Sequence, residues 1–184
     1  MRREMRLRRA SVCAGERRRA ARRAAAALMR LRCWRHARHV ALYLAYGSEL
    51  PTAPLLEQAW VQRKRVYVPR LGSDGRMRFF ELRRGAPMRR NRHGILEPAG
   101  RVPHRPLHGI DLLLAPLLGF DAHGFRLGTG GGYYDRSLVR RLPGRPVCLG
   151  WALAIQEIPA VPRDPWDQRL DGIVTDRGLR WAIG

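Results

Sequence analysis

The architecture of this chain is clearest around Arg126-Leu127-Gly128-Thr129-Gly130-Gly131-Gly132-Tyr133-Tyr134-Asp135-Arg136. An apolar run over residues 110–118 precedes this stretch and predicts a buried strand, and residues 133–141 predict a helix. Four glycines in five positions leave the backbone without Cβ atoms, so its N–H groups can approach an anion closely. Such a segment between a strand and a helix predicts a phosphate-binding loop, although a flexible turn has the same composition.

Strands and helices alternate on both sides of this stretch. Further helices are expected at residues 53–63, with Thr52 as the N-cap, and at residues 153–158. Residues 83–108 are rich in Arg, Pro and Gly and are expected to form a long irregular surface segment. The alternation indicates an α/β fold with a largely parallel sheet. The predicted strands are residues 40–46, 65–69, 77–82, 110–115, 146–151 and 172–175.

The first part of the chain predicts helix, because Ala and Arg are strong helix formers and residues 2–35 contain no proline. A break is expected between Ser11 or Cys13 and Glu16. We therefore expect a single domain over residues 1–184, in which residues 1–39 form an Arg-rich helical segment and residues 40–184 form the α/β core.

The net charge of +21 raises the question of a nucleic-acid partner. Only one of the 36 basic residues, Lys64, is a lysine, so the arginine bias runs through the whole chain, as coding in a GC-rich genome would give. The arginines are not interleaved with aromatic residues on strands, the pattern of RNA-binding sheets. The 14 arginines among the first 40 residues keep an arginine-rich, nucleic-acid-associated protein as the alternative.

The sequence also bears on the cellular compartment in which the protein is expected. No apolar run approaches the roughly 20 residues of a membrane span, and the basic start is not followed by an apolar signal segment. Cys13, Cys33 and Cys148 are widely spaced and odd in number, which favours free thiols over a disulfide framework or a zinc site. We expect a cytoplasmic protein.

Several segments resemble one known family. Residues 111–121 and 124–136 are similar to the signature of the 5-formyltetrahydrofolate cyclo-ligase family, also called 5,10-methenyltetrahydrofolate synthetase. The resemblance covers essentially the whole chain. It implies a three-layer α/β fold whose mostly parallel central sheet is flanked by helices (Rossmann-like, NagB/RpiA/CoA-transferase-like), with an N-terminal helical segment. Further segments in the family's order are residues 40–52, 64–69, 94–98, Gln156, 166–171 and 174–175.

The resemblance implies an ATP- and Mg²⁺-dependent cyclisation of 5-formyltetrahydrofolate to 5,10-methenyltetrahydrofolate, with release of ADP and phosphate. The formyl oxygen would first be phosphorylated, giving an imidate phosphate. The implied partners are 5-formyltetrahydrofolate and ATP, with no membrane. A nucleic-acid partner is not favoured, and the chain is expected to be a monomer or a weak homodimer.

The resemblance also implies the site residues. Asp135 and Asp167 would hold Mg²⁺, with Asp164 and Asp171 as close rivals of Asp167 in the sequence. Judged without the family, Asp135 could either favour the dipole of the helix near its start or hold a metal, and the residues alone favour the dipole role. The resemblance implies catalytic roles for Arg126 and Tyr133. The implied ATP-binding residues are Arg2, Arg126, Leu127, Gly128, Thr129, Gly130, Gly131, Gly132, Tyr133 and Tyr134, and the implied substrate-binding residues are Leu44, Glu49, Thr129, Gly130, Gly131, Gly132 and Tyr133.

Two of these residues stand out. A carboxylate such as Glu49 can accept hydrogen bonds from the N–H groups of a pterin ring, although a βα turn near a helix start also favours an acidic residue. Thr129 stands where the family usually carries arginine or another long side chain.

Overall fold

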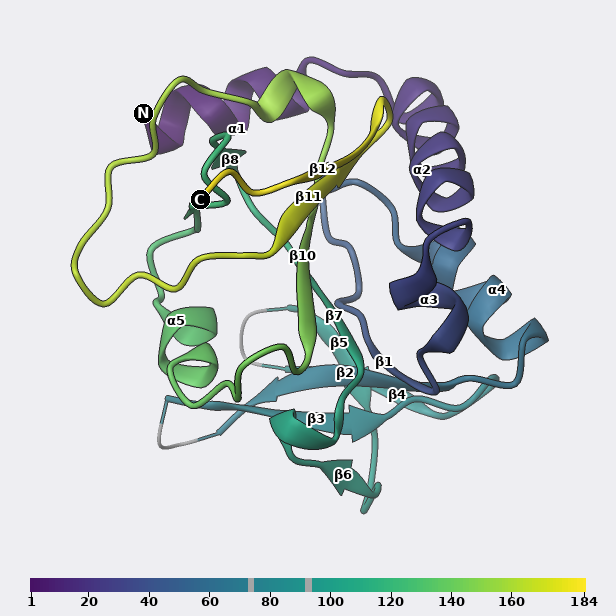
Figure 1. Cartoon of the computed structure of the whole chain (residues 1–184). Helices are drawn as coiled ribbons and strands as arrows, with labels where there is room; N and C mark the ends of the chain where they lie inside the picture. The colour runs from purple at the N-terminus through teal and green to yellow at the C-terminus, as the bar shows by residue number, and fades with distance from the viewer. Residues whose placement is uncertain (73–74, 92–93) are drawn as a thin grey trace.

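A computed structural model describes residues 1–72, 75–91 and 94–184. Within those residues, the centre of the molecule is an eight-stranded sheet (Figure 1). In spatial order its strands are β12 (Gly178–Trp181), β11 (Gly172–Thr175), β10 (Val147–Trp151), β7 (Leu112–Ala115), β1 (His39–Ala41), β2 (Arg65–Leu71), β3 (Met77–Glu81) and β6 (His104–Arg105).

The five inner strands, from β11 to β2, run parallel, whereas β12, β3 and β6 are antiparallel at the two edges. The apolar run that predicted a central strand occupies β7, whose four residues are all buried between β1 and β10. The predicted α/β fold with a mostly parallel sheet is therefore confirmed. The strand predicted at residues 40–46 ends at Ala41, and β12 was not predicted.

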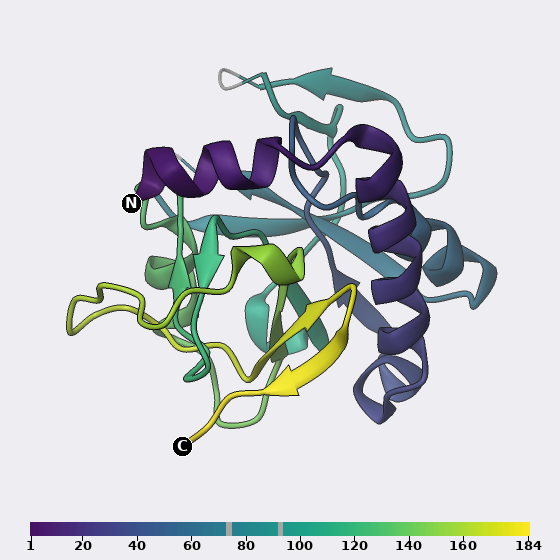
Figure 2. The same cartoon turned by 90° about the horizontal axis from the view of Figure 1, so that it is seen from above.

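Helices cover both faces of the sheet, so the predicted three-layer arrangement is confirmed (Figures 1 and 2). The helices α2 (Ala14–Met29), α3 (Arg32–His36) and α4 (Ala53–Val61) pack on one face around Leu28, Trp34 and Leu55. The short helix α5 (Tyr133–Leu138) packs on the other face through Leu138. The first helix, α1 (Arg2–Ala10), lies across the end of the sheet beyond β7, with Met5 packed on Leu118.

The expected break in the N-terminal helix lies between α1 and α2. The Sγ atom of Cys13 accepts the backbone N–H of Glu16 at 3.5 Å, and the Glu16 carboxylate accepts the backbone N–H of Cys13 at 3.3 Å. This reciprocal pair satisfies donors at the start of α2. Because α2 packs into the same core as the sheet, the helical segment is part of the α/β unit.

Other boundaries differ from the expectation. Residues 83–108 contain a hairpin, β4 (Met88–Arg90) with β5 (Leu96–Pro98), as well as β6, so this segment is only partly irregular. Thr52 is the N-cap residue of α4, as predicted, but its hydroxyl donates to the Tyr43 carbonyl at 2.8 Å and makes no side-chain capping hydrogen bond. The helix predicted at residues 153–158 is the single 3₁₀ turn η2 (Ala154–Gln156).

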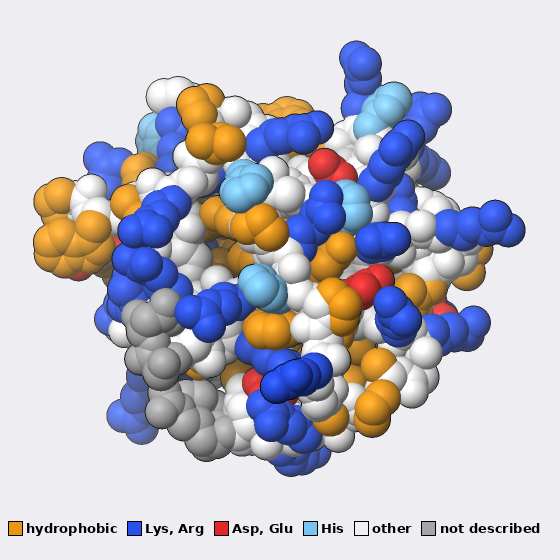
Figure 3. All heavy atoms as spheres, turned by 90° about the horizontal axis from the view of Figure 1, so that it is seen from below, with side chains coloured by type: hydrophobic (Ala, Val, Ile, Leu, Met, Phe, Trp, Pro, Cys, Tyr) orange, Lys and Arg blue, Asp and Glu red, His pale blue; other side chains and the backbone are white. Residues whose placement is uncertain are grey.

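Basic side chains are spread over the surface. On the face seen in Figure 3, Lys and Arg side chains lie scattered among hydrophobic and other polar ones and do not form one continuous stripe. The single lysine, Lys64, instead closes the end of α3, where its Nζ donates to the carbonyls of Trp34 at 2.8 Å and Ala37 at 2.7 Å. No helix in the described ranges is long and apolar enough to cross a membrane.

Candidate active site

The glycine-rich loop, residues 128–132, lies beyond the carboxyl end of β7. It does not follow β7 directly, as the sequence suggested, because a hairpin of β8 (Gly119–Phe120) and β9 (Arg126–Leu127) comes between them. Gly130 has φ +105° and Gly132 has φ +61°, conformations that L-residues with a Cβ rarely adopt. A Cβ on Gly132 would also lie 2.8 Å from Arg136 Nη1.

Two arginines hold this loop in place. Arg2 Nε donates to the carbonyl of Gly128 at 3.2 Å, and Arg136 Nη2 donates to the carbonyl of Gly131 at 2.7 Å. The loop is therefore a fixed feature and not simply a flexible turn. Its Thr129, Gly130 and Gly131 are exposed, whereas the side chain of Leu127 is buried, so Leu127 can offer a ligand only its backbone.

The helix after the loop is shorter than expected. It spans Tyr133–Leu138, six residues instead of the nine predicted at 133–141, so its dipole adds little to anion binding. The capacity of the loop for phosphate rests instead on its backbone N–H groups and the neighbouring arginines. The ring of Tyr133 lies 5.0 Å from the guanidinium of Arg136, and that of Tyr134 lies 5.6 Å from the guanidinium of Arg126.

Arg126 and Asp135 form a tight ion pair behind the loop. Arg126 Nη2 donates to Asp135 Oδ1 at 2.6 Å, and Arg126 Nη1 donates to the Gln168 carbonyl at 2.8 Å. Asp135 Oδ1 also accepts the backbone N–H of Gln168 at 3.1 Å. The side chain of Arg126 is only 4% exposed. Asp135 therefore fastens the segment around Gln168 to α5, a role beyond favouring the helix dipole.

The same contact brings Asp167 beside Asp135, because Asp167 precedes Gln168 in the chain. Asp167 Oδ2 accepts the backbone N–H of Asp164 at 2.9 Å within an exposed turn. Asp171, by contrast, is occupied elsewhere: its carboxylate accepts from Arg141 at 2.6 Å and from the Cys148 N–H at 2.7 Å. Of the carboxylates that rival one another in sequence, Asp167 is the one held directly against the Asp135 contact.

The two carboxylates have the donor set of a magnesium site. Among the described residues, Asp135 Oδ2 and Asp167 Oδ1 have no hydrogen bond, so each carboxylate keeps one oxygen for a metal ion. The described chain holds no group of three or more His, Cys, Asp or Glu that could hold a metal. Magnesium usually takes one or two carboxylates and completes its shell with phosphate oxygens and water, so these two side chains are of the type and number that the ion takes beside a nucleotide.

Glu49 lies in the segment that follows β1. Its Oε2 accepts the backbone N–H of Tyr46 at 2.9 Å, and its Oε1 lies 3.9 Å from Arg9 Nη1. Burial raises the pKa of Glu49, and the Tyr46 N–H and the Arg9 charge partly oppose that rise. The Glu49 carboxylate also interacts electrostatically with the partly buried Tyr134, which connects it to α5. Leu44 lies in the same segment, packed on the core around α2 and α4.

Three residues at this site were not predicted: Arg9, Arg136 and Gln168. Arg136 belongs to the glycine-rich stretch of sequence, but its hydrogen bond to the loop depends on how the chain folds back on itself. Arg9 had a detectable signal, since Arg2, Met5 and Arg9 recur at helical spacing and share one face of α1. That signal was hidden in a run of arginines. Gln168 acts through its backbone, for which its side-chain type gives no clue.

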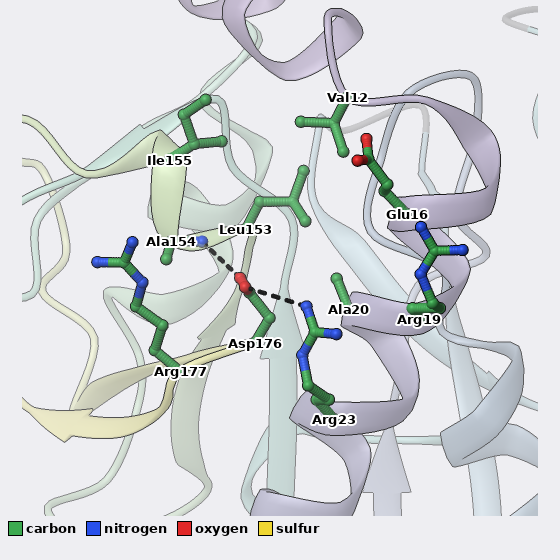
Figure 4. A pocket seen from close by; sticks show the side chains of 10 residues that line it. All are labelled: Val12, Glu16, Arg19, Ala20, Arg23, Leu153, Ala154, Ile155, Asp176 and Arg177. Atoms are coloured by element: carbon green, nitrogen blue, oxygen red, sulfur yellow. Dashed lines mark hydrogen bonds and ion pairs between the residues drawn. The ribbon is translucent and has the colours of Figure 1, made fainter.

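Two hollows of the surface lie outside the glycine-rich loop. One, of about 420 Å³, separates α2 from η2 and the turn after β11 (Figure 4). In it Asp176 accepts the Ala154 N–H at 2.9 Å and pairs with Arg23 at 3.6 Å. The other, of about 250 Å³, adjoins Arg141 and Gln168. Neither is lined by the glycine-rich loop, which lies open on the surface. We place the candidate site at the loop, where the carboxylates and arginines converge.

Solved structures resemble the whole fold. A structure of 5,10-methenyltetrahydrofolate synthetase from Aquifex aeolicus matches with a TM-score of 0.86 and 28% identity, covering 100% of this chain and 91% of that chain. A structure of the 5,10-methenyltetrahydrofolate synthetase from Mycoplasma pneumoniae matches with a TM-score of 0.77 and 25% identity. The match covers 95% of this chain and 96% of that chain. The fold of this chain is therefore that of the α/β enzymes named 5,10-methenyltetrahydrofolate synthetase.

Sequence comparison gives the family. The chain belongs to the 5-formyltetrahydrofolate cyclo-ligase family, whose sequence profile matches residues 1–176. The 5-formyltetrahydrofolate cyclo-ligase of Escherichia coli K12 is 39% identical over 139 residues, which are 74% of this chain and 76% of that protein. The enzyme of the same name from Haemophilus influenzae is 36% identical over 143 residues, 76% of each chain. The resemblance drawn from the sequence is confirmed, and the activity is that of a 5,10-methenyltetrahydrofolate synthetase.

Proposed function

We propose that this chain cyclises 5-formyltetrahydrofolate to 5,10-methenyltetrahydrofolate at the expense of ATP, with Mg²⁺, releasing ADP and phosphate. The contact at Gln168 carries the proposal. Its backbone N–H and the guanidinium of Arg126 both reach Asp135 Oδ1, and Asp167 is the next residue back along the chain. Two carboxylates and an arginine thus stand beside a held glycine-rich loop, the groups that a magnesium-bound triphosphate needs.

The reaction proceeds in two steps. In the first, a bond forms between the formyl oxygen and the γ-phosphorus of ATP, the bond from that phosphorus to the β–γ bridging oxygen breaks, and ADP leaves. In the second, N10 of the folate attacks the formyl carbon, the new C–N bond forms and the C–O bond breaks. Phosphate departs with the formyl oxygen and takes up the N10 proton. Phosphorylation is required because an amide oxygen is otherwise a poor leaving group.

The loop binds the phosphates. Backbone N–H groups of residues 128–132 donate to the phosphate oxygens, and Arg2 adds a positive charge at the start of the loop. Arg126 acts from behind the loop, where its buried charge orients Asp135. Tyr133 lies at the start of α5, where the formyl oxygen meets the γ-phosphoryl group. The protein's contribution is mainly positioning and charge stabilisation, as in other phosphoryl transfers.

The folate lies on the side of Glu49. Its carboxylate accepts from the N–H donors of the pterin, and Leu44 gives the ring an apolar wall. Asp135 and Asp167 would hold Mg²⁺, since each carboxylate has an oxygen without a hydrogen bond to a described residue. Bound Mg²⁺ neutralises charge on the triphosphate.

Isotope transfer tests this function. With 5-formyltetrahydrofolate labelled with ¹⁸O in the formyl group, the label is expected in the released phosphate, and phosphate release should require both ATP and the folate. Label that remained with water or folate would contradict phosphorylation of the formyl oxygen. Phosphate release without folate would show an ATPase of another kind.

Glu49→Gln is expected to weaken folate binding without lowering the free energy of unfolding at pH 7. Because burial raises the pKa of Glu49, the folded protein holds this proton more tightly than the unfolded chain, so ionisation lowers stability as pH rises through the carboxyl titration. The variant should be at least as stable as the parent at pH 7, with an advantage that disappears below about pH 4. The KM for folate should rise about 10-fold or more. A variant that lost stability at pH 7 would show that ionised Glu49 supports the fold.

A further inference from the structure

Arg9 is a charged side chain buried at the edge of the candidate site. It is 9% exposed, whereas the other arginines of α1 point to solvent. It follows Met5 by one helical turn, and Met5 packs against Leu118 and Leu127 just beyond β7. The packing of α1 therefore presses the Arg9 guanidinium against the ends of the parallel strands. A guanidinium is costly to bury unless its donors find partners.

The guanidinium of Arg9 joins the segments that follow β1 and β7 and keeps donors free. Arg9 Nε donates to Ser48 Oγ at 3.1 Å, and Nη1 donates to the carbonyl of Leu117 at 3.3 Å. Nη1 also lies 3.9 Å from Glu49 Oε1, an ion-pair distance and not a hydrogen bond. Nη2 makes no hydrogen bond to any residue that the structure describes. A largely buried side chain whose Nη1 lies near the Glu49 carboxylate thus keeps the two N–H donors of Nη2 free of hydrogen bonds to described residues.

Arg9 and Glu49 stabilise each other's charge. Burial lowers the pKa of Arg9, and the Glu49 carboxylate opposes that change; burial raises the pKa of Glu49, and Arg9 opposes it in turn. Loss of Arg9 would therefore raise the pKa of Glu49 further. The other groups that act on this pair are the phenols of Tyr43 and Tyr134, the backbone N–H of Tyr46, and the like charges of Arg6 and Arg17.

We propose that Arg9 is a specificity-determining residue that recognises the pterin carbonyl while Glu49 recognises the adjacent N–H donors. This rests on the function proposed above, which places the folate at Glu49. One edge of the pterin carries N–H donors next to a carbonyl oxygen, so it matches a carboxylate next to a guanidinium. A lone carboxylate would accept a 2,4-diaminopteridine, which has an amino group in place of that carbonyl. The Arg9 donors would instead face a donor and disfavour it.

Ligand discrimination tests the proposal. Equilibrium binding of 5-formyltetrahydrofolate, of a 2,4-diaminopteridine and of ATP is measured on the parent protein, on Arg9→Met and on Arg8→Met, an exposed arginine of the same helix. Arg9→Met should weaken folate binding about 10- to 100-fold and leave ATP binding within about 2-fold. The preference for folate over the diaminopteridine should collapse by a similar factor. The acid limb of the folate-binding profile should move to higher pH. Arg8→Met should behave as the parent in every measurement.

Each other result contradicts the proposal. An unchanged preference in folded Arg9→Met, or an equal loss of folate and ATP binding, would make Arg9 a packing residue of α1. If Arg9→Met does not fold, Arg9→Lys decides, since lysine keeps the charge but not the planar fork. A reduced preference in Arg9→Lys supports the proposal and an unchanged one overturns it. Binding is measured without turnover, so a parent protein that binds folate but makes no product would contradict the proposed reaction alone.

Discussion

Asp167→Asn is expected to lower kcat by about 100-fold or more, because a metal-bound carboxylate supports several kcal/mol of charge stabilisation in phosphoryl transfer. Its melting temperature should stay within about 2 °C of the parent. Asp167 lies in an exposed turn, and the one hydrogen bond that its side chain makes to a described residue, from the Asp164 N–H to Oδ2, can be kept by the amide oxygen of asparagine. Steady-state kinetics and thermal unfolding give both quantities.

Asp135→Asn should lose turnover to a similar degree but also lose stability. Asparagine removes the charge that pairs with Arg126, whose side chain is only 4% exposed. Leaving a buried charge unpaired is costly, and we expect a loss of about 2–3 kcal/mol, since Asp135 itself is 21% exposed. The two aspartates should therefore have matching kinetic effects and different stabilities.

The control for both is Asp164→Asn in the same turn as Asp167, which should keep parental kinetics. Near-normal turnover in Asp167→Asn would mean that this carboxylate does not serve the metal. If Asp164→Asn lost turnover instead, the metal ligand of this turn would have been assigned to the wrong residue.

Gly130→Ala is expected to lower kcat/KM for ATP by about 100-fold, with a much smaller effect on the KM for folate. The φ of +105° at Gly130 is strained for alanine, so the loop would relax and misdirect its N–H groups. A displacement of about 1 Å at a positioning group can cost a factor of about 100 in rate. No atom lies within 4 Å of the site of the new Cβ, so the effect comes from the backbone and not from a clash.

Gly85→Ala is the matched control. Gly85 has φ +71° with open space around its Cβ position, and it lies in an exposed turn away from the candidate site. Both variants should lose about 1–2 kcal/mol of stability, but only Gly130→Ala should lose ATP-dependent turnover. Equal kinetics in the two variants would show that the conformation of the glycine-rich loop does not matter for the nucleotide.

Local sequence signals were sufficient for most of the sheet. The fully buried β7 is apolar throughout, so its strand and its central place followed directly from residues 112–115. The β8–β9 hairpin was missed because two-residue strands give no periodic signal. Thr52 was expected to cap α4, but a nearby acceptor, the Tyr43 carbonyl, took its hydroxyl. Such competition depends on tertiary contacts that the local pattern does not encode.

For the candidate site too, local sequence predicted some features, while others depend on tertiary contacts. The family resemblance pointed to Asp167, but the peptide contact at Gln168 that brings it beside Asp135 joins segments 33 residues apart. Arg9 was missed because its burial depends on how α1 crosses the strand ends, while its neighbours in the sequence are arginines that face water. The residue types of the candidate site could be predicted from the sequence, whereas the pairing of the charged side chains depends on the fold.

The central claim is tested most directly by the absorbance of the methenyl product. Folded protein mixed with 5-formyltetrahydrofolate and Mg²⁺ should give no signal until ATP is added, and the methenyl band should then grow with one phosphate released for each folate converted. A protein that binds 5-formyltetrahydrofolate but gives no ATP-dependent methenyl absorbance would contradict the account.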